Sequence, residues 1–127
     1  MKLEDQVLSI EQVRELQELG FDVKKYASMY FVPNWITKYG IDEIQDYLLA
    51  IGELGVDYEG DCIPTMTIGD MADILPIEID EYVLDMNRIY VSYDSKRNNL
   101  FYAYKHRFID NLFDCLVWCI KQKHIAL

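Results

Sequence analysis

Apolar residues recur every three or four positions between residues 10 and 19, with charged and polar residues between them. This period is typical of a helix that buries one face. Ser9 stands directly before the stretch and Gln12 follows three positions later. That spacing forms a capping box, in which each side chain bonds a backbone N–H group that the helix leaves unpaired. Gly20 can end the helix in a left-handed conformation, so the pattern predicts a helix over residues 10–19.

A second helical period runs through residues 41–51, where apolar side chains again repeat at intervals of three and four. Asp42, Glu43 and Asp46 fall in its first turns, where negative charge interacts favourably with the helix dipole. The pattern predicts a second helix that ends near Gly52.

Two further helices are predicted in the second half of the chain. Thr67 is placed to cap a short helix over residues 68–75, with Asp70 at the third helical position and Pro76 at the exit. A wide apolar stripe over residues 108–123 predicts a longer core helix.

The remaining apolar segments have the composition or the alternation of β-strands. Residues 26–32 predict a short strand, and residues 52–64, with three glycines, predict an exposed connection. The C-terminal half predicts three antiparallel strands, formed by residues 77–86, 89–93 and 100–104. The expected architecture is α+β: a single domain over residues 1–127, with a three-stranded antiparallel meander, about four helices, and the last helix packed across the sheet.

Length and composition agree with a single folded domain. The chain has 127 residues and a mass of 15.0 kDa, and domains most often have about 100–150 residues. Hydrophobic residues make up 51% and charged residues 27%, as in globular proteins. No apolar run approaches the roughly 18–20 residues needed to cross a bilayer, and residues 1–5 lack the apolar region of a signal peptide. We therefore expect a cytoplasmic protein that does not enter a membrane.

The three cysteines are too few, and odd in number, for the disulfide framework of a small secreted domain. Cys115 and Cys119 are four positions apart in an apolar stretch, so we expect them to share a buried helix face as reduced thiols. A zinc site would need two further ligands, and His106 and His124 do not complete any spacing that zinc modules use. No metal or cofactor is predicted.

Charge is distributed unevenly along the chain. The net charge is −10, yet residues 1–85 carry −14 and residues 86–127 carry +4. No Lys or Arg occurs between residues 39 and 87, a pattern that either favours solubility or provides a surface for a basic partner. The main functional hypothesis is an acidic protein-interaction module that contacts a partner protein with a basic surface. Its predicted contact residues are Asp42, Glu43, Asp46, Asp70, Asp73, Glu78, Asp80 and Glu81.

The C-terminal strands suggest a different surface, in which aromatic residues alternate with basic ones. Such a surface can stack single-stranded bases and bind phosphates, although half of these aromatics are expected to form the core. A nucleic-acid-associated regulator is therefore the alternative hypothesis, while the net negative charge excludes general coating of DNA or RNA. An exposed strand edge or the tyrosine surface could also support a homodimer. The alternative surface consists of Arg88, Tyr90, Lys96, Arg97 and Tyr102.

Signals for catalysis are weak. The glycine positions fit neither a P-loop nor a dinucleotide fingerprint. His106 and His124 lie at opposite ends of the last predicted helix, roughly 25 Å apart, which is too far for one site. Glu78 and Asp80 could act as acid and base only if one of them were buried. We expect no enzyme, and a small enzyme of unknown class is the third hypothesis.

One acidic run resembles the opening of an EF-hand calcium loop, because Asp57, Glu59 and Asp61 alternate. Cys62 then replaces the glycine that the sharp turn needs, and Ile68 replaces the bidentate glutamate. At most, weak cation binding remains open at these three carboxylates.

Several segments resemble, as a set, small uncharacterised proteins carried by phages and integrated elements of gut anaerobes. They are residues 8–12 leading into 16–20, residues 63–68 leading into 73–76, and residues 111–112 leading into 118–120. Residues 33–62 depart from that pattern. The resemblance implies a short acidic accessory protein of a phage or mobile element, for which protein binding is more expected than catalysis. It implies that the basic partner is a host or phage protein, and it transfers no catalytic or binding residue.

Overall fold

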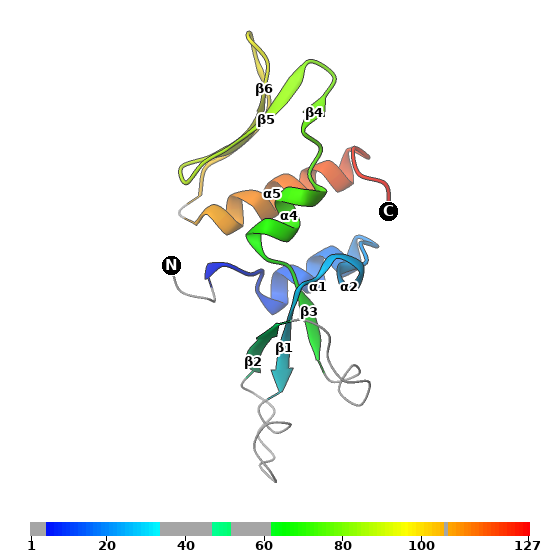
Figure 1. Cartoon of the computed structure of the whole chain (residues 1–127). Helices are drawn as coiled ribbons and strands as arrows, with labels where there is room; N and C mark the ends of the chain where they lie inside the picture. Colours follow the sequence, from blue (N-terminus) through cyan, green and yellow to red (C-terminus); the bar gives the residue numbers. More distant parts are fainter. Residues whose placement is uncertain (1–4, 34–46, 52–61, 106) are drawn as a thin grey trace.

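The computed structural model describes residues 5–33, 47–51, 62–105 and 107–127. Within these ranges the chain forms an α+β fold of four helices and seven strands (Figure 1). In chain order these are α1 (Ile10–Glu18), α2 (Val23–Tyr26), β1 (Met29–Pro33), β2 (Tyr47–Ile51), β3 (Ile63–Thr65), α4 (Ile68–Ile74), β4 (Glu78–Ile79), β5 (Tyr82–Met86), β6 (Val91–Asp94), β7 (Asn99–Ala103) and α5 (Phe108–Lys121).

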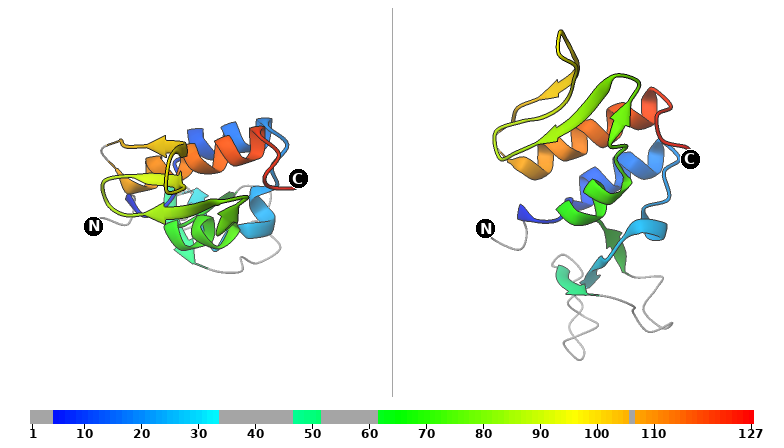
Figure 2. Two further views of the ribbon diagram at one scale, coloured as in Figure 1. Left: turned by 90° about the horizontal axis from the view of Figure 1, so that it is seen from above. Right: turned by 45° about the horizontal axis from the view of Figure 1, so that its top comes forward.

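The described strands form two antiparallel sheets. One has three strands in the order β2-β1-β3, and the other has four strands in the order β4-β5-β6-β7. Figure 2 shows the four-stranded sheet covering one side of α5, with α1 and α4 on the other side of that helix. The predicted packing of the last helix across the sheet is therefore confirmed.

The predicted three-stranded meander was incomplete. The stretch over residues 77–86 was predicted as one strand, but Asp80 and Glu81 form a tight turn that divides it into β4 and β5. Asp80 has a φ of 54° there, a left-handed conformation that aspartate adopts more readily than most residues. The meander consequently has four strands.

The predicted helix caps are confirmed. At α1, Ser9 and Gln12 form the capping box, and at α4, Thr67 and Asp70 do the same. Gly20 has a φ of 86°, as expected for the residue that terminates α1. These signals are local, because they depend on side chains that bond the backbone within three residues.

The helix predicted over residues 41–51 was wrong over Tyr47–Ile51, which forms strand β2; residues 41–46 lie outside the described residues. The sequence Tyr-Leu-Leu-Ala-Ile is continuously apolar, and such a run fits a buried strand as well as a helix. This segment forms a strand because it pairs with β1 along its whole length, from Met29 opposite Ile51 to Pro33 opposite Tyr47.

Two neighbouring predictions need smaller corrections. The strand predicted over residues 26–32 begins later, at Met29, because residues 23–26 form the helical turn α2. The connection predicted over residues 52–64 ends in strand β3, which pairs with the other edge of β1. Thr65 on β3 is fully buried, and its hydroxyl donates a hydrogen bond of 2.7 Å to the carbonyl oxygen of Leu8.

One core joins these elements. Buried side chains from the N-terminal segment, α1, α4, β6 and α5 form a single cluster, with α5 at its centre. Leu112, Cys115, Leu116 and Cys119 on α5 are completely buried. None of the three cysteines forms a disulfide, in agreement with the expected reduced thiols.

The N-terminal turn of α5 is tied to α1 through the carboxylate of Asp110. Arg107 donates two hydrogen bonds to this carboxylate, each 2.9 Å, and the side-chain amide of Gln12 donates a third of 2.9 Å. The hydrogen bonds from Arg107 are the main reason why the pKa of Asp110 is lowered from its ordinary value.

We expect Asp110→Asn to lower the free energy of unfolding by about 1 kcal/mol at neutral pH. Because the folded-state pKa of Asp110 is below the unfolded value of about 3.9, the ionised carboxylate stabilises the fold above that value. This contribution disappears as the pH falls through the folded pKa. Urea unfolding at neutral and strongly acidic pH should therefore show a difference between wild type and variant that shrinks on acidification. The exposed Asp73→Asn variant is the control, and a difference independent of pH would contradict this account.

Candidate functional site

The four-stranded sheet has one face against α5 and one face directed away from it, here called the outer face. Val91 and Tyr93 on β6 are completely buried against α5. Side chains alternate along a strand, so Ser92 points to the outer face, although it is itself completely buried. The strand register is irregular between Tyr93 and Asp94, but the hydrogen bond from Ser92 to Asp94 places both on the same side. The strand registers then assign the outward residues of the neighbouring strands.

Two rows of side chains cross the outer face. In the first row, Val83 lies between Glu78 on β4 and Asp94 on β6. In the second row, Ser92 lies between Asp85 on β5 and Tyr102 on β7. Directly opposed side chains have Cβ atoms about 4.5–5.5 Å apart. Three carboxylates, those of Glu78, Asp85 and Asp94, therefore share this face.

Three tyrosines also lie on the outer face and are here called the tyrosine row. One of them, Tyr102, ends the second row of side chains. The ring of Tyr102 lies 5.3 Å from that of Tyr90 and 5.5 Å from that of Tyr104, measured between centroids. The hydroxyl of Tyr90 donates a hydrogen bond of 2.8 Å to Asp85, and this bond raises the pKa of Tyr90. Tyr102 is 46% exposed and Tyr104 is 72% exposed.

The outer face is acidic and contains no basic residue from its own strands, since β4, β5, β6 and β7 lack Lys and Arg. The Asp94 carboxylate accepts a hydrogen bond of 2.7 Å from the hydroxyl of Ser92. Its other oxygen is buried and has no partner within the described part of the chain. This face can thus offer carboxylates and aromatic rings, but no cations, to a partner.

The predicted acidic contact residues fall into three groups. Glu78, Asp80 and Glu81 are exposed at or beside the β4–β5 turn, and Asp73 is exposed on α4. Asp70 already accepts hydrogen bonds from Ser28 and Thr67, which gives its carboxylate a structural role. The remaining predicted acids lie outside the described residues: Asp42, Glu43 and Asp46, together with the possible cation ligands Asp57, Glu59 and Asp61.

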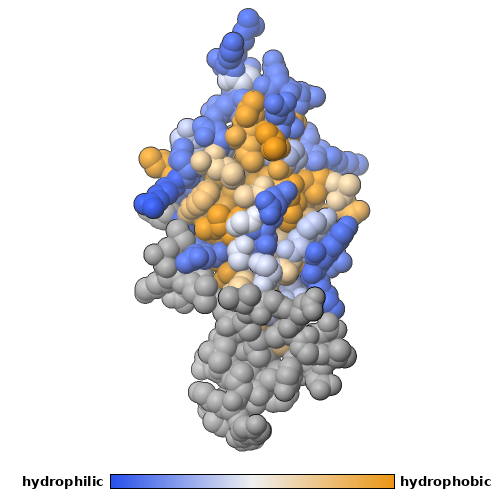
Figure 3. Space-filling view, viewed as in Figure 1, coloured by the Kyte–Doolittle hydropathy of each residue, from blue (hydrophilic) through white to orange (hydrophobic). Residues whose placement is uncertain are grey.

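The predicted nucleic-acid surface is only partly brought together. Tyr90 and Tyr102 stack on the outer face, but the basic residues lie in turns at opposite ends of β6. Arg88 is in the β5–β6 turn, whereas Lys96 and Arg97 are in the β6–β7 turn, which projects at the top of Figure 1 and is hydrophilic in Figure 3. The four residues of β6, which extend about 13 Å, separate the two turns.

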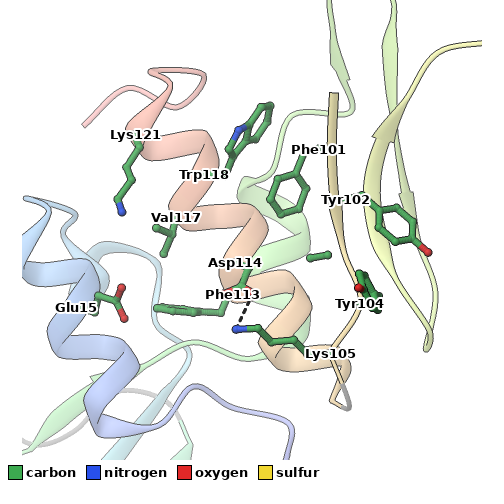
Figure 4. Close-up of a pocket in the computed structure, with 11 residues that line it drawn as sticks. Glu15, Phe101, Tyr102, Tyr104, Lys105, Phe113, Asp114, Val117, Trp118 and Lys121 are labelled. Carbon is green, nitrogen blue, oxygen red and sulfur yellow. Dashed lines mark ion pairs between the residues drawn. The ribbon is translucent and has the colours of Figure 1, made fainter. Parts of the chain in front are cut away.

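A hollow of about 550 Å³, here called the β7 groove, lies between β7, α5 and α1 (Figure 4). Residues 101–105 line one side, and Phe113, Val117 and Trp118 of α5 line the other, with Glu15 of α1 near one end. Phe101 points toward Trp118, with ring centroids 5.1 Å apart.

The charged residues of the β7 groove balance one another. Lys105 Nζ lies 2.9 Å from Asp114 Oδ2, and this hydrogen bond raises the pKa of Lys105. Glu15 and Lys121 are exposed at its margin. The lining between them is aromatic and aliphatic, so apolar contact rather than charge dominates the groove.

The sequence pattern alone does not indicate that Phe113, Val117 and Trp118 form part of a binding surface. They belong to the wide apolar stripe of α5, which was interpreted only as core. Phe113 is indeed 6% exposed, whereas Val117 and Trp118 are half-buried. The apolar stripe of α5 is wider than the area that the neighbouring elements cover. That excess width is the signal that could have indicated the groove.

The thiol of Cys115 and the carboxylates of Glu78 and Asp80 have different surroundings. Hydrogen bonding with Cys119 and burial raise the pKa of Cys115, so its thiol stays protonated. Glu78 and Asp80 are exposed rather than buried. Across the ranges that the structure describes, no group of three or more His, Cys, Asp or Glu residues could hold a metal ion.

In the described part of the chain, none of the helices combines the length and apolarity that crossing a membrane requires. No family model matches the sequence, and neither the curated proteins nor the solved structures contain a significant match. The outer face and the β7 groove are therefore the features from which a function can be inferred.

Proposed function

We propose that this chain is a non-enzymatic protein-interaction module that binds a basic surface of a partner protein through the outer face of its four-stranded sheet. The observation that carries the proposal is the set of three carboxylates and three tyrosines on a face whose strands contain no Lys or Arg. Of the acidic contact residues suggested by the sequence, the outer face includes Glu78. The proposal adds the acids Asp85 and Asp94 and the tyrosines of the alternative surface, Tyr90 and Tyr102.

Protein interfaces combine such groups for physical reasons. Tyrosine provides a large contact area with few rotatable bonds, and it is enriched where partners meet. Basic side chains of a partner can lie over the tyrosine rings and pair with the neighbouring carboxylates. Val83, which is 47% exposed between Glu78 and Asp94, adds an aliphatic contact. The proposed role agrees with the phage-type accessory protein that the sequence resemblance implies.

A nucleic-acid partner is the second candidate, because the stacked pair Tyr90 and Tyr102 could hold unpaired bases. The charges disfavour it. Asp85 and Asp94 would face the phosphates, and Arg88 is at the opposite end of β6 from Lys96 and Arg97. Binding that disappears after nuclease treatment, with a steep loss of affinity in salt, would support this candidate instead.

Charge reversal on the outer face tests the proposal. The variant Glu78→Lys, Glu81→Lys, Asp85→Lys replaces three exposed acids, so attraction to a basic partner becomes repulsion. Affinity capture from nuclease-treated host lysate, read by quantitative mass spectrometry, should show basic proteins that wild type retains. We expect the variant to retain them at least about tenfold less, a loss of about 1.4 kcal/mol in binding free energy.

A matched variant separates this effect from net charge. Glu11→Lys, Glu18→Lys, Asp22→Lys also reverses three exposed acids, and it leaves the outer face unchanged. Each reversal adds two positive charges, so both variants carry −4 instead of −10. The proposal would be overturned if both variants retained equally reduced amounts of the basic proteins. It would also be overturned if both retained as much as wild type.

A further inference from the structure

Strand β7 is an open sheet edge. It is the last strand in the order β4-β5-β6-β7, and no other strand in the described ranges pairs with its outer side. Natural proteins commonly protect such edges with charged residues or proline. The five residues Asn99–Ala103 include neither. Their unpaired backbone N–H and C=O groups can therefore pair with an added strand.

The β7 groove runs along this edge rather than beneath one face of the sheet. Five consecutive residues, 101–105, line it. Phe101, Tyr102 and Ala103 belong to β7, and residues 104 and 105 follow it. Consecutive strand residues point to opposite faces, so these three can line one hollow only if that hollow lies beside the strand. An extended peptide is the shape that fits a groove along a strand edge.

The two sides of such a peptide would meet different surroundings. On one side, its side chains would enter the groove beside Phe101, Val117 and Trp118, which is apolar. On the other side, they would lie beside Tyr102 and Tyr104, which point away from α5 (Figure 4). Exposed tyrosine rings attract Lys and Arg through cation–π contacts. The carboxylates of Asp85 and Glu78, two and three strands away from β7, add a weaker attraction at longer range.

We propose that the β7 edge binds an extended segment of a partner protein as an added strand, with apolar residues alternating with Lys or Arg. The apolar residues occupy the β7 groove and the basic residues cover Tyr102 and Tyr104. This inference deepens the proposed function and rests on it, because it specifies the basic partner of the same acidic sheet. A second copy of the chain is a poorer occupant, since two molecules of charge −10 repel each other.

A labelled synthetic peptide of seven residues, in which Leu or Val alternates with Lys or Arg, is the probe for this inference. Fluorescence anisotropy should show at least about tenfold tighter binding than for a peptide of the same composition with its basic residues grouped together. Replacing Lys and Arg by Glu in the alternating peptide should abolish binding. Hydrogen exchange should show new protection of backbone N–H groups in Asn99–Ala103, which non-specific attraction between charges would not produce.

Variants of the apolar groove test the role of the peptide's apolar residues, and variants of the exposed tyrosines test the role of its basic residues. Val117→Gln makes the groove floor polar, and Tyr102→Ser with Tyr104→Ser removes the exposed rings. We expect each to weaken binding of the alternating peptide, by about two- to fivefold for every tyrosine removed. Ile89→Ser removes another exposed apolar side chain, 72% exposed in the β5–β6 turn, and should leave the affinity unchanged.

The outcomes separate this inference from the proposed function. Equal binding of the alternating and grouped peptides, without protection of β7, would overturn strand addition, while loss in the Glu78, Glu81, Asp85 variant would still support the acidic face. Dimer formation by the protein alone, with protection of β7, would replace the proposed occupant by a second copy. Failure of every peptide would overturn strand addition, and the lysate capture would then decide the proposed function independently.

Discussion

Replacing Tyr93 by alanine should lower the free energy of unfolding by about 3–5 kcal/mol, a large part of the 5–15 kcal/mol typical of a small domain. The side chain is completely buried between β6 and α5, and its ring centroid lies 5.8 Å from that of Trp118. Its hydroxyl donates a hydrogen bond of 2.7 Å to the carbonyl oxygen of Pro76. Alanine would leave a cavity in the hydrophobic cluster that joins β6 to α1, α4 and α5. Chemical denaturation would measure the loss of stability.

The conservative variant Tyr93→Phe separates the ring from the hydroxyl. We expect it to cost about 1–3 kcal/mol, since the ring remains and the Pro76 carbonyl loses its buried donor. Tyr102→Ala is the matched control, because Tyr102 is exposed on the next strand and should cost less than about 1 kcal/mol. Equal losses for Tyr93→Ala and Tyr102→Ala would show that burial against α5 does not determine stability.

Asn111→Ala should lower the free energy of unfolding by about 2–3 kcal/mol, although asparagine is small and polar. Its side chain is completely buried at the start of α5. The amide oxygen accepts a hydrogen bond from the backbone N–H of Lys105, and the amide nitrogen donates one of 3.4 Å to the carbonyl oxygen of Ile89. This one side chain therefore joins the end of β7 and the β5–β6 turn to α5.

The loss of stability in Asn111→Ala should be accompanied by a local change in hydrogen exchange. Hydrogen exchange at the Lys105 N–H should accelerate more than the change in global stability requires, because the variant removes its acceptor. Asn98→Ala, at an exposed position in the β6–β7 turn, is the control and should change stability by less than about 0.5 kcal/mol. A Lys105 N–H that exchanges no faster than the rest of the core would contradict this role.

These two residues connect stability with the proposed binding surface. Tyr93 holds β6 against α5, and Asn111 holds the segment that follows β7. The β7 edge and the groove beside it are therefore supported by buried contacts rather than by a free loop. A surface supported in this way loses little conformational entropy when a partner strand binds, which favours affinity.

The parts of the fold that depend on neighbouring residues could be predicted from the sequence. Capping boxes at Ser9 and Thr67 act within three residues, and the apolar stripe over residues 108–123 is long enough to exclude other periods. The strand predicted over residues 100–104 is observed as β7, and the alternation of side chains along a strand implies that Phe101 and Ala103 face away from Tyr102 and Tyr104. The burial of Ala103 and the exposure of the two tyrosines confirm that prediction.

Features that depend on distant segments could not be predicted in this way. Residues 47–51 form a strand because β1 supplies hydrogen-bond partners along their whole length, and nothing in the local pattern indicates that pairing. The turn at Asp80 was missed because its left-handed conformation is stabilised by the pairing of β4 with β5 on either side.

The candidate site shows the same division. The sequence alone determined that the chain is acidic, that residues 39–87 lack Lys and Arg, and that tyrosines occur on the C-terminal strands. From the sequence, the acidic residues and the tyrosines were predicted to form two alternative surfaces. Only the strand registers place Glu78, Asp85 and Tyr102 on one face, and only the packing of α5 leaves β7 as an open edge beside an apolar groove. Both arrangements require contacts between residues far apart in the chain, which composition and periodicity cannot specify.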